Sequence, residues 1–143
     1  MGADDETRIR QLFDQWVGAV RAKDVDGSLA GWAPDVVTFD LIEPLQYRGV
    51  DAVRRRLEDW FSSFAGPIGY ELGDLSVTAG NGVAFAHSLN HVSGTTTDGT
   101  TLDMWWRATV CLRKLDGDWL VTHSHTSVPF DMESGQASVG LRP

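Results

Sequence analysis

The hydrophobic pattern of this chain changes its period at Gly66-Pro67. Before that point, apolar residues recur every three or four positions, which is typical of helices with one apolar face. The clearest run consists of Ile9, Leu12, Phe13, Trp16, Val17 and Val20. After it, apolar and polar residues alternate, which is typical of strands. A chain ordered in this way is expected to form an α+β domain, with a sheet packed against a layer of helices.

Three helices and one early strand are predicted before the change of period. The first helix contains the run from Ile9 to Val20. The second is short, is capped by Asp24 and ends at Pro34, because an aspartate accepts hydrogen bonds at a helix start and a proline interrupts a helix. The third opens at Gly49. Between the second and third helices, residues 36–40 are β-branched and aromatic, which favours a strand.

Four further strands are predicted, over residues 68–77, 83–93, 102–114 and 119–127. Asp116-Gly117 is a strong hairpin signal, and Thr95–Gly99 is a second hairpin loop. These four strands are therefore expected to form an antiparallel meander, which with the early strand makes a curved sheet around the helices. We expect one domain over residues 1–143, with its core in 5–130 and a loosely held polar tail at 131–143.

Composition restricts the partners of this chain. The net charge is −8, so phosphate backbones and anionic membrane surfaces are repelled, and neither nucleic acid nor membrane is expected as a partner. No apolar run approaches the ~20 residues of a membrane span, and the first ten residues lack an apolar signal core. The single cysteine, Cys111, cannot form an internal disulfide. The expected location is the cytoplasm.

Two histidines lie two residues apart on the last predicted strand. His123 and His125 share a face with Trp119, Val121 and Ser127, since side chains of a strand alternate. That alternation predicts that the histidine face is directed inward or toward a subunit interface. Such a pair can also bind zinc or iron when further ligands are available, here from His87, His91 or Asp103. A metal site remains an alternative, and no metal or other cofactor is predicted.

Two motifs carry a resemblance to a known superfamily. Residues 116–127 read Asp-Gly-x-Trp-x-Val-x-His-x-His-x-Ser, which resembles the association domain of calcium/calmodulin-dependent kinase II and the SnoaL-like group close to it. The N-terminal half resembles ketosteroid isomerase through Trp16-Val17, Lys23–Gly27, Pro34-Asp35 and Phe39-Asp40. Both belong to the nuclear transport factor two-like superfamily. The resemblance implies a cone-shaped α+β fold, with a curved sheet around a ligand pocket and a homodimer formed by the outer sheet face.

The resemblance also assigns roles to individual residues. Asp40 matches the general base of ketosteroid isomerase. Trp16 stands in place of the tyrosine that binds the oxyanion in ketosteroid isomerase. Thr109 or Val110 stands in place of the protonated aspartic acid of that enzyme. An indole donates one hydrogen bond but cannot act as an acid, so steroid isomerisation is not expected. Most of the kinase domain's pocket arginines are also replaced, here by His87, Val110 and Thr126.

Strand alternation adds further candidate residues. His87 and His91 share a face with Val83, Phe85 and Leu89, and that face is expected to be buried. Trp106 lies on an apolar face that forms core or pocket wall, whereas Arg107 and Trp105 lie on the opposite face, where a dimer would form. On the last strand the alternation places His125 inward, whereas the resemblance places Thr126 beside the pocket. A strand bulge would reconcile the two.

Two function classes follow. In the first, the protein is a small-molecule isomerase or cyclase in which Asp40 removes a proton next to a carbonyl and His87 or Trp16 polarises the oxygen. The substrate is then a small apolar or polyketide-like molecule. In the second, the domain binds a small ligand or builds oligomers without catalysis. The residues expected at the site are Asp40 and His87 as catalytic groups, Trp16, His91, Trp106, Val110 and Thr126 as ligand contacts, and His123, His125 and Arg107 as alternatives.

Overall fold

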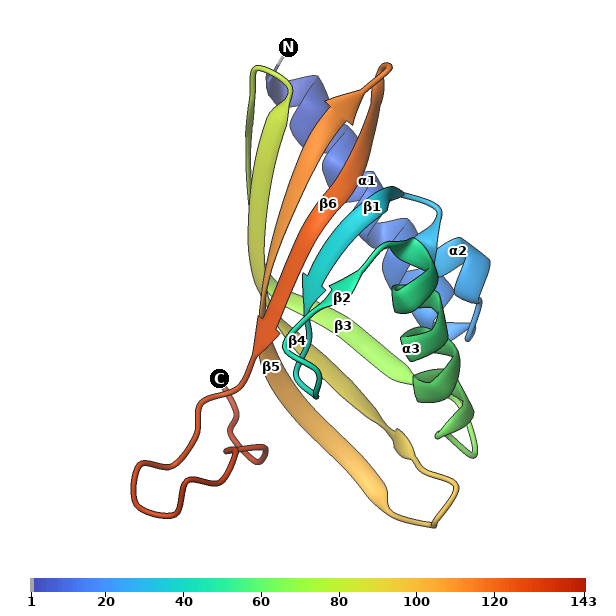
Figure 1. Ribbon diagram of the computed structural model, residues 1–143, viewed down its shortest axis with the longest axis vertical. Coiled ribbons are helices and arrows are strands. Elements are labelled where there is room, and N and C mark those ends of the chain that lie inside the picture. The colour runs from blue at the N-terminus through green and yellow to red at the C-terminus, as the bar shows by residue number, and fades with distance from the viewer. Residues whose placement is uncertain (1) are drawn as a thin grey trace.

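The computed structural model describes residues 2–143 (Figure 1). It contains three helices and a six-stranded sheet. The elements in chain order are α1 (Gly2–Arg21), α2 (Val25–Leu29), β1 (Trp32–Phe39), β2 (Tyr47–Arg48), α3 (Val50–Ser62), β3 (Gly69–Gly80), β4 (Val83–Thr95), β5 (Thr101–Leu115) and β6 (Asp118–Ser127). The predicted α+β class and the order of helices before the meander are confirmed.

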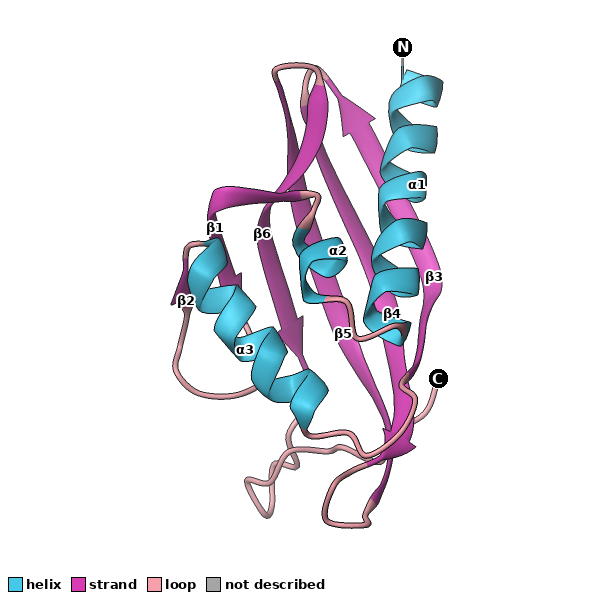
Figure 2. Cartoon of the chain, turned by 90° about the vertical axis from the view of Figure 1, so that its right-hand side faces the viewer, coloured by secondary structure: helices cyan, strands magenta, loops and turns pink. Residues whose placement is uncertain are grey.

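The sheet has the strand order β2-β1-β6-β5-β4-β3. Strands β3 to β6 form the expected antiparallel meander, whereas β1 runs parallel to β6 and β2 extends the edge beyond β1. The sheet is strongly curved, and the helices cover one of its faces (Figures 1 and 2). Helix α1 lies along β3, and α3 lies against β1. Among the described residues, no helix lies over the opposite face of β3 to β6 (Figure 1).

The second helix ends earlier than the sequence predicted. Asp24 caps α2 as expected, since the Gly27 N–H donates to its carboxylate over 3.0 Å. The helix stops at Leu29, however, and Pro34 lies inside β1. The register between β1 and β6 shifts between Trp32 and Val37, so this part of β1 is irregular and tolerates a residue without a backbone N–H.

A bulge in β6 decides which of its side chains reach the interior. Leu112 of β5 pairs with Val121, but Cys111 pairs with His123, so Thr122 is an extra residue on β6. A bulge shifts the alternation of the strand by one position. Trp119 and Val121 before it, and Ser124 after it, are therefore all buried on the inner face. His123 and His125 lie on the outer face, which excludes the inward alternative of the prediction and leaves a subunit interface as the other.

Strand β4 also presents the opposite face from the one predicted. Its buried side chains are small or polar: Ala84, Ala86, Ser88, Asn90 and Val92. The face that carries the histidines is the outer one, where Val83 and Phe85 are 52% and 51% exposed. The prediction that this face is buried in the chain is wrong. Aromatic and β-branched side chains favour strands whichever face they occupy, so composition did not identify the inner face.

The hydrophobic core forms where α1 and α3 meet the inner face of the sheet. Ile9 and Phe13 of α1 are 0% and 2% exposed and pack with Val36, Val110 and Val121. A second cluster around Phe61 and Tyr70 continues this core toward the ends of β3, β4 and β5. In the described part of the chain, no helix has the length and hydropathy required to span a membrane.

Candidate functional site

A cavity of about 480 Å³ lies between the helices and the inner face of the sheet. Its volume is within the range of small-molecule sites. Of the six tryptophans in the sequence, four contribute to its wall. They are Trp16, Trp32, Trp60 and Trp106. Most of the remaining wall is aliphatic, including Leu29, Val53, Leu57, Val92, Leu102, Met104 and Ala108. The cavity is therefore suited to a planar, largely apolar molecule.

Asp40 and Arg56 are the charged residues of this wall among the residues that the structure describes. Asp40 directly follows β1, and Arg56 lies on α3, which packs against that strand. Arg56 Nε lies 3.3 Å from Asp40 Oδ2, and the two side chains are 22% and 25% exposed. The Leu41 N–H donates to Asp40 Oδ1 over 2.6 Å. A carboxylate next to a guanidinium is thus fixed at one side of an apolar cavity.

Asp40 also faces a second, more open groove. The groove is formed by residues 39–46 and His125, and Asp40 lines both spaces. Asp40 therefore stands where the inner cavity adjoins an open surface.

Two buried nitrogen atoms on the cavity residues have no hydrogen-bond acceptor among the described residues. They are Trp32 Nε1 and Arg56 Nε. The contact of Arg56 Nε with Asp40 is close enough for an ion pair, but its direction does not make it a hydrogen bond. An unsatisfied buried donor costs on the order of 1–3 kcal/mol. A ligand oxygen that reached either atom would supply the missing acceptor.

A chain of buried polar groups lies on the strands farther from Asp40. Ser88 Oγ donates to Asn90 Oδ1 over 2.7 Å, and Asn90 Nδ2 donates to Tyr70 Oη over 3.2 Å. These three residues are 8%, 2% and 5% exposed. Asn90 and Tyr70 line the cavity. Burial raises the pKa of Tyr70 well above its usual range, although the Asn90 hydrogen bond acts in the opposite direction. Tyr70 is therefore a neutral phenol at physiological pH.

Four of the residues expected at the site line the cavity: Asp40, Trp16, Trp106 and Thr126. Trp16 packs edge-on against Trp32 with ring centroids 5.3 Å apart. Thr126 reaches the wall because of the Thr122 bulge. Val110 has the predicted inward direction but belongs to the hydrophobic core rather than to the cavity wall.

The remaining candidates lie on the outer face of the sheet. His87 is exposed there and pairs with Thr109 of β5. It therefore does not face Asp40 across the cavity, and its expected position as a catalytic group in the pocket is wrong. His91 is on the same face. His123 and His125 contact Phe39, with ring centroids 4.6 and 5.4 Å apart. Arg107 Nε donates to Ser127 Oγ over 3.2 Å.

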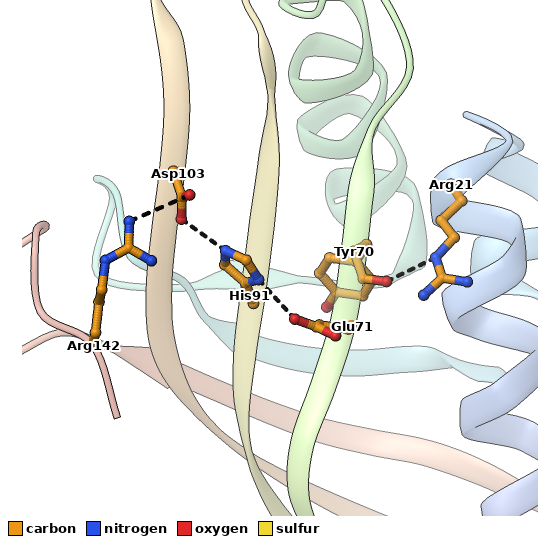
Figure 3. A network of polar contacts seen from close by, with 6 residues as sticks. All are labelled: Arg21, Tyr70, Glu71, His91, Asp103 and Arg142. Carbon is orange, nitrogen blue, oxygen red and sulfur yellow. Dashed lines mark hydrogen bonds and ion pairs between the residues drawn. The ribbon is translucent and has the colours of Figure 1, made fainter.

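His91 is the centre of a charged network (Figure 3). Its two ring nitrogens lie 2.8 Å from Glu71 Oε1 and 2.7 Å from Asp103 Oδ1, and its ring stacks on Trp105 at 4.4 Å. The hydrogen bond to Glu71, and to a lesser extent the one to Asp103, raises the pKa of His91. The hydrogen bond from His91 lowers the pKa of Asp103. Arg142 of the C-terminal segment adds a contact to Asp103 at 3.3 Å. Both ring nitrogens of His91 are therefore engaged in contacts outside the cavity.

No group of three or more histidine, cysteine, aspartate or glutamate residues within 2–143 is arranged to hold a metal ion. The histidine pair of β6 lies beside an aromatic ring, Phe39, and one imidazole nitrogen, His123 Nδ1, is 2.6 Å from the Val37 carbonyl oxygen.

The C-terminal segment contributes to the cavity. Most of residues 131–143 are exposed, as expected for a tail. Ala137 and Val139 nevertheless line the cavity, and an isolated bridge joins Phe130 to Ala137.

Sequence reasoning missed Arg56, Tyr70 and Asn90. Arg56 sits among charged residues of α3 that the helical period assigns to a solvated face. Asn90 lies on the less hydrophobic of the two faces of β4. A signal for it was available: small and polar side chains at 84, 86, 88 and 90 alternate as regularly as the apolar ones.

The sequence of this chain matches the family model of the SnoaL-like domain over residues 9–131. The chain belongs to the SnoaL-like family. This confirms the predicted resemblance for nearly the whole domain. Among curated proteins, none matches the chain.

Solved structures agree with this family. An NTF2-like protein of unknown function from Pseudomonas putida KT2440 is 39% identical, with a TM-score of 0.91 over 100% of this chain and 99% of that one. A ketosteroid isomerase-like protein from Erwinia carotovora atroseptica SCRI1043 is 20% identical, with a TM-score of 0.72 over 85% and 93% of the two chains. A candidate calcium/calmodulin-dependent protein kinase II association domain from Xanthomonas campestris is 20% identical, with a TM-score of 0.72 over 83% and 84%. The last two show the fold that this SnoaL-like protein shares.

Proposed function

We propose that this SnoaL-like protein binds a planar, largely apolar carbonyl compound in its cavity and transfers a proton at the carbon next to the carbonyl, as an isomerase or cyclase does. Asp40 is the general base. The observation that carries the proposal is the position of Asp40 next to Arg56 on the wall of an aromatic cavity that Trp32 also lines.

The chemistry requires a base and donors for the oxygen. The Asp40 carboxylate accepts the proton from the carbon, and the electron pair of that C–H bond forms the enolate C=C bond while negative charge moves to the oxygen. Donors that face this oxygen in a dry site stabilise the charge, and removing one such donor costs about 3 kcal/mol in known enzymes. Arg56 and Trp32 are proposed for the role that was predicted for His87 or Trp16. The proton then returns from Asp40 to the same or another carbon.

Exchange of hydrogen for deuterium tests this proposal. 1-Tetralone, a bicyclic ketone, is incubated with the protein in D2O, and loss of the proton signal at the carbon next to the carbonyl is followed by NMR. We expect the protein to accelerate exchange over buffer. Asp40→Asn is expected to lower the accelerated rate by about 100-fold or more, because general-base catalysis contributes about 10²–10⁴-fold.

Asp35→Asn is the matched control, since Asp35 is an exposed residue of β1 outside the cavity wall. Quenching of tryptophan fluorescence measures binding of 1-tetralone separately. Binding without accelerated exchange would disprove the general-base role. Equal rates for Asp40→Asn and the unmodified protein would do so as well.

A second function, ligand binding without catalysis, is favoured by one observation. Within the described residues, Asp40 is the only cavity-lining group with a carboxylate, and the outer-face histidines supply no second acid or base there. Binding of 1-tetralone with no exchange would support this second function. In both cases we propose a homodimer, which forms through the outer face of the sheet.

A further inference from the structure

The wall of the cavity has a second polar region, distant from Asp40 in the order of strands. Asp40 follows β1, whereas Tyr70 is on β3 and Asn90 is on β4. Strands β6 and β5 lie between β1 and β4. At a spacing of about 4.8 Å per strand, the path along the sheet from β1 to β4 is about 14 Å, which the curvature shortens in space. The wall between them carries Trp106 and Ala108 of β5 and Ser124 of β6.

The hydroxyl of Tyr70 has a donor that its neighbours do not use. Its oxygen accepts from Asn90 Nδ2 over 3.2 Å, and Asn90 Oδ1 accepts from Ser88 Oγ over 2.7 Å. A tyrosine hydroxyl both accepts and donates. None of the described hydrogen bonds uses the Tyr70 O–H as donor. The side chain is 5% exposed and lines the cavity, so a group bound in the cavity can supply the acceptor.

The surroundings of Tyr70 hold this hydroxyl in one position. Arg21 Nε donates to the Tyr70 backbone carbonyl over 2.8 Å and ties β3 to α1 (Figure 3). The Tyr70 ring packs against Trp106 and Trp60, with centroids 6.0 and 6.3 Å apart. Burial keeps the phenol protonated, so the donor is present throughout the physiological range. A donor held in this way selects an acceptor at low entropic cost.

We propose that the Tyr70 hydroxyl, oriented by Asn90, donates a hydrogen bond to a second acceptor oxygen of the ligand, at the end remote from Asp40. The ligand class is therefore a planar aromatic molecule of two or more rings with acceptor oxygens at opposite ends. This inference rests on the proposed cavity ligand but not on catalysis by Asp40.

The test compares two ligands that differ in one oxygen. 2,6-Diacetylnaphthalene carries acceptors at both ends, and 2-acetyl-6-isopropenylnaphthalene replaces one carbonyl oxygen by a methylene group of similar size. Dissociation constants are measured by quenching of tryptophan fluorescence. We expect the diketone to bind more tightly, and Tyr70→Phe to reduce its preference over the monoketone by about fivefold to tenfold, the value of a neutral hydrogen bond.

Tyr47→Phe is the matched control. The sequence has two tyrosines, and Tyr47 lies outside the cavity wall, where its hydroxyl donates to the Glu43 carbonyl over 3.0 Å. The preference for the diketone should be unchanged in this variant. An equal preference in Tyr70→Phe and the unmodified protein would overturn the Tyr70 role, even when both ligands bind. Failure of every ligand to bind would overturn the proposed cavity ligand and the Tyr70 role together.

A measurement on the unmodified protein covers the case in which Tyr70→Phe does not fold. The infrared carbonyl bands of the bound diketone are compared with those in an apolar solvent. We expect both bands at lower wavenumber than in the solvent, since both oxygens accept hydrogen bonds. A band that remains at the solvent position would overturn the proposal. Accelerated exchange of 1-tetralone without a preference for the diketone would leave the Asp40 proposal standing and contradict this one.

Discussion

At the scale of single residues, the proposed chemistry depends on Asp40 and on two buried donors without an acceptor among the described residues. Arg56 Nε and Trp32 Nε1 are buried without acceptors, while Asp40 stays beside Arg56 as an ion pair. A fold that only needed stability would gain from apolar side chains in these places, because an unsatisfied buried donor is costly. We infer that a ligand compensates for these groups when it binds.

His91 allows a residue-scale prediction about pH. Its pKa is raised in the folded state, so its stabilisation is fully present below its usual pKa of 6.5 and is lost as the pH rises through the raised value. The lowered pKa of Asp103 gives stability that is present above 3.8 and lost as the pH falls through the lowered value. The contacts of this network should therefore stabilise the protein most between about pH 4 and 6.5.

The substitution His91→Gln should lower the melting temperature more at pH 5.5 than at pH 9. The difference between the two pH values should be about 1–3 °C, because exposed ion pairs contribute little to stability. Thermal unfolding followed by circular dichroism at both pH values measures this difference. His87→Gln is the control, since His87 is on the same face without an ion pair among the described residues. A difference that does not change with pH would contradict the predicted role of His91.

At the scale of elements, the bulge of β6 determines the inner face of the last strand. Thr122 is the extra residue, and the inner positions are Trp119 and Val121 before it and Ser124 and Thr126 after it. Without an extra residue, strict alternation continued from Val121 would place His123 and His125 inside. The bulge therefore places the hydroxyls of Ser124 and Thr126, and not two histidines, on the cavity wall.

Deletion of single residues tests this account of β6. Deleting Thr122 should be tolerated with a modest loss of stability, because every remaining side chain keeps its face. Deleting Leu120 should move Trp119, which is 4% exposed, to the outer face. Loss of a large buried side chain costs about 3–5 kcal/mol. Urea unfolding measures both losses, and equal losses in the two deletions would refute the assigned bulge.

At the scale of the whole molecule, the outer face of the sheet is the surface without a covering layer. Phe39, Val83 and Phe85 are 36%, 52% and 51% exposed on it. Exposed apolar side chains on one face are consistent with the interaction surface that we propose. In the symmetric dimer that we propose, a second copy of the chain covers this face with its own outer face.

Phe85→Glu should convert the proposed dimer into a monomer, since a buried carboxylate without a partner is unfavourable at an interface. Light scattering after gel filtration gives the mass of each form. Met132→Glu is the control, because Met132 is 85% exposed in the C-terminal segment. A monomeric unmodified protein, or a dimer that survives Phe85→Glu, would exclude this interface.

The order of elements was predictable because it depends on local spacing. A period of three to four residues identifies α1 and α3, a period of two identifies the meander, and Asp116-Gly117 identifies its last hairpin. The motifs near Asp40 and in β6 identified the superfamily. These features are properties of neighbouring residues, which a sequence contains directly.

The composition of the site depended on tertiary structure, because its residues meet from separate elements. Asp40 follows β1, Arg56 comes from α3, and Tyr70 and Asn90 come from β3 and β4. Which face of a strand is buried depends on the layer that packs on it, and one extra residue reverses that face for the rest of the strand. The sequence by itself thus determined the fold and the catalytic candidate Asp40. Only the packing of helices on one side of the curved sheet decided that Arg56, Tyr70 and Asn90, and not His87, lie in the same cavity.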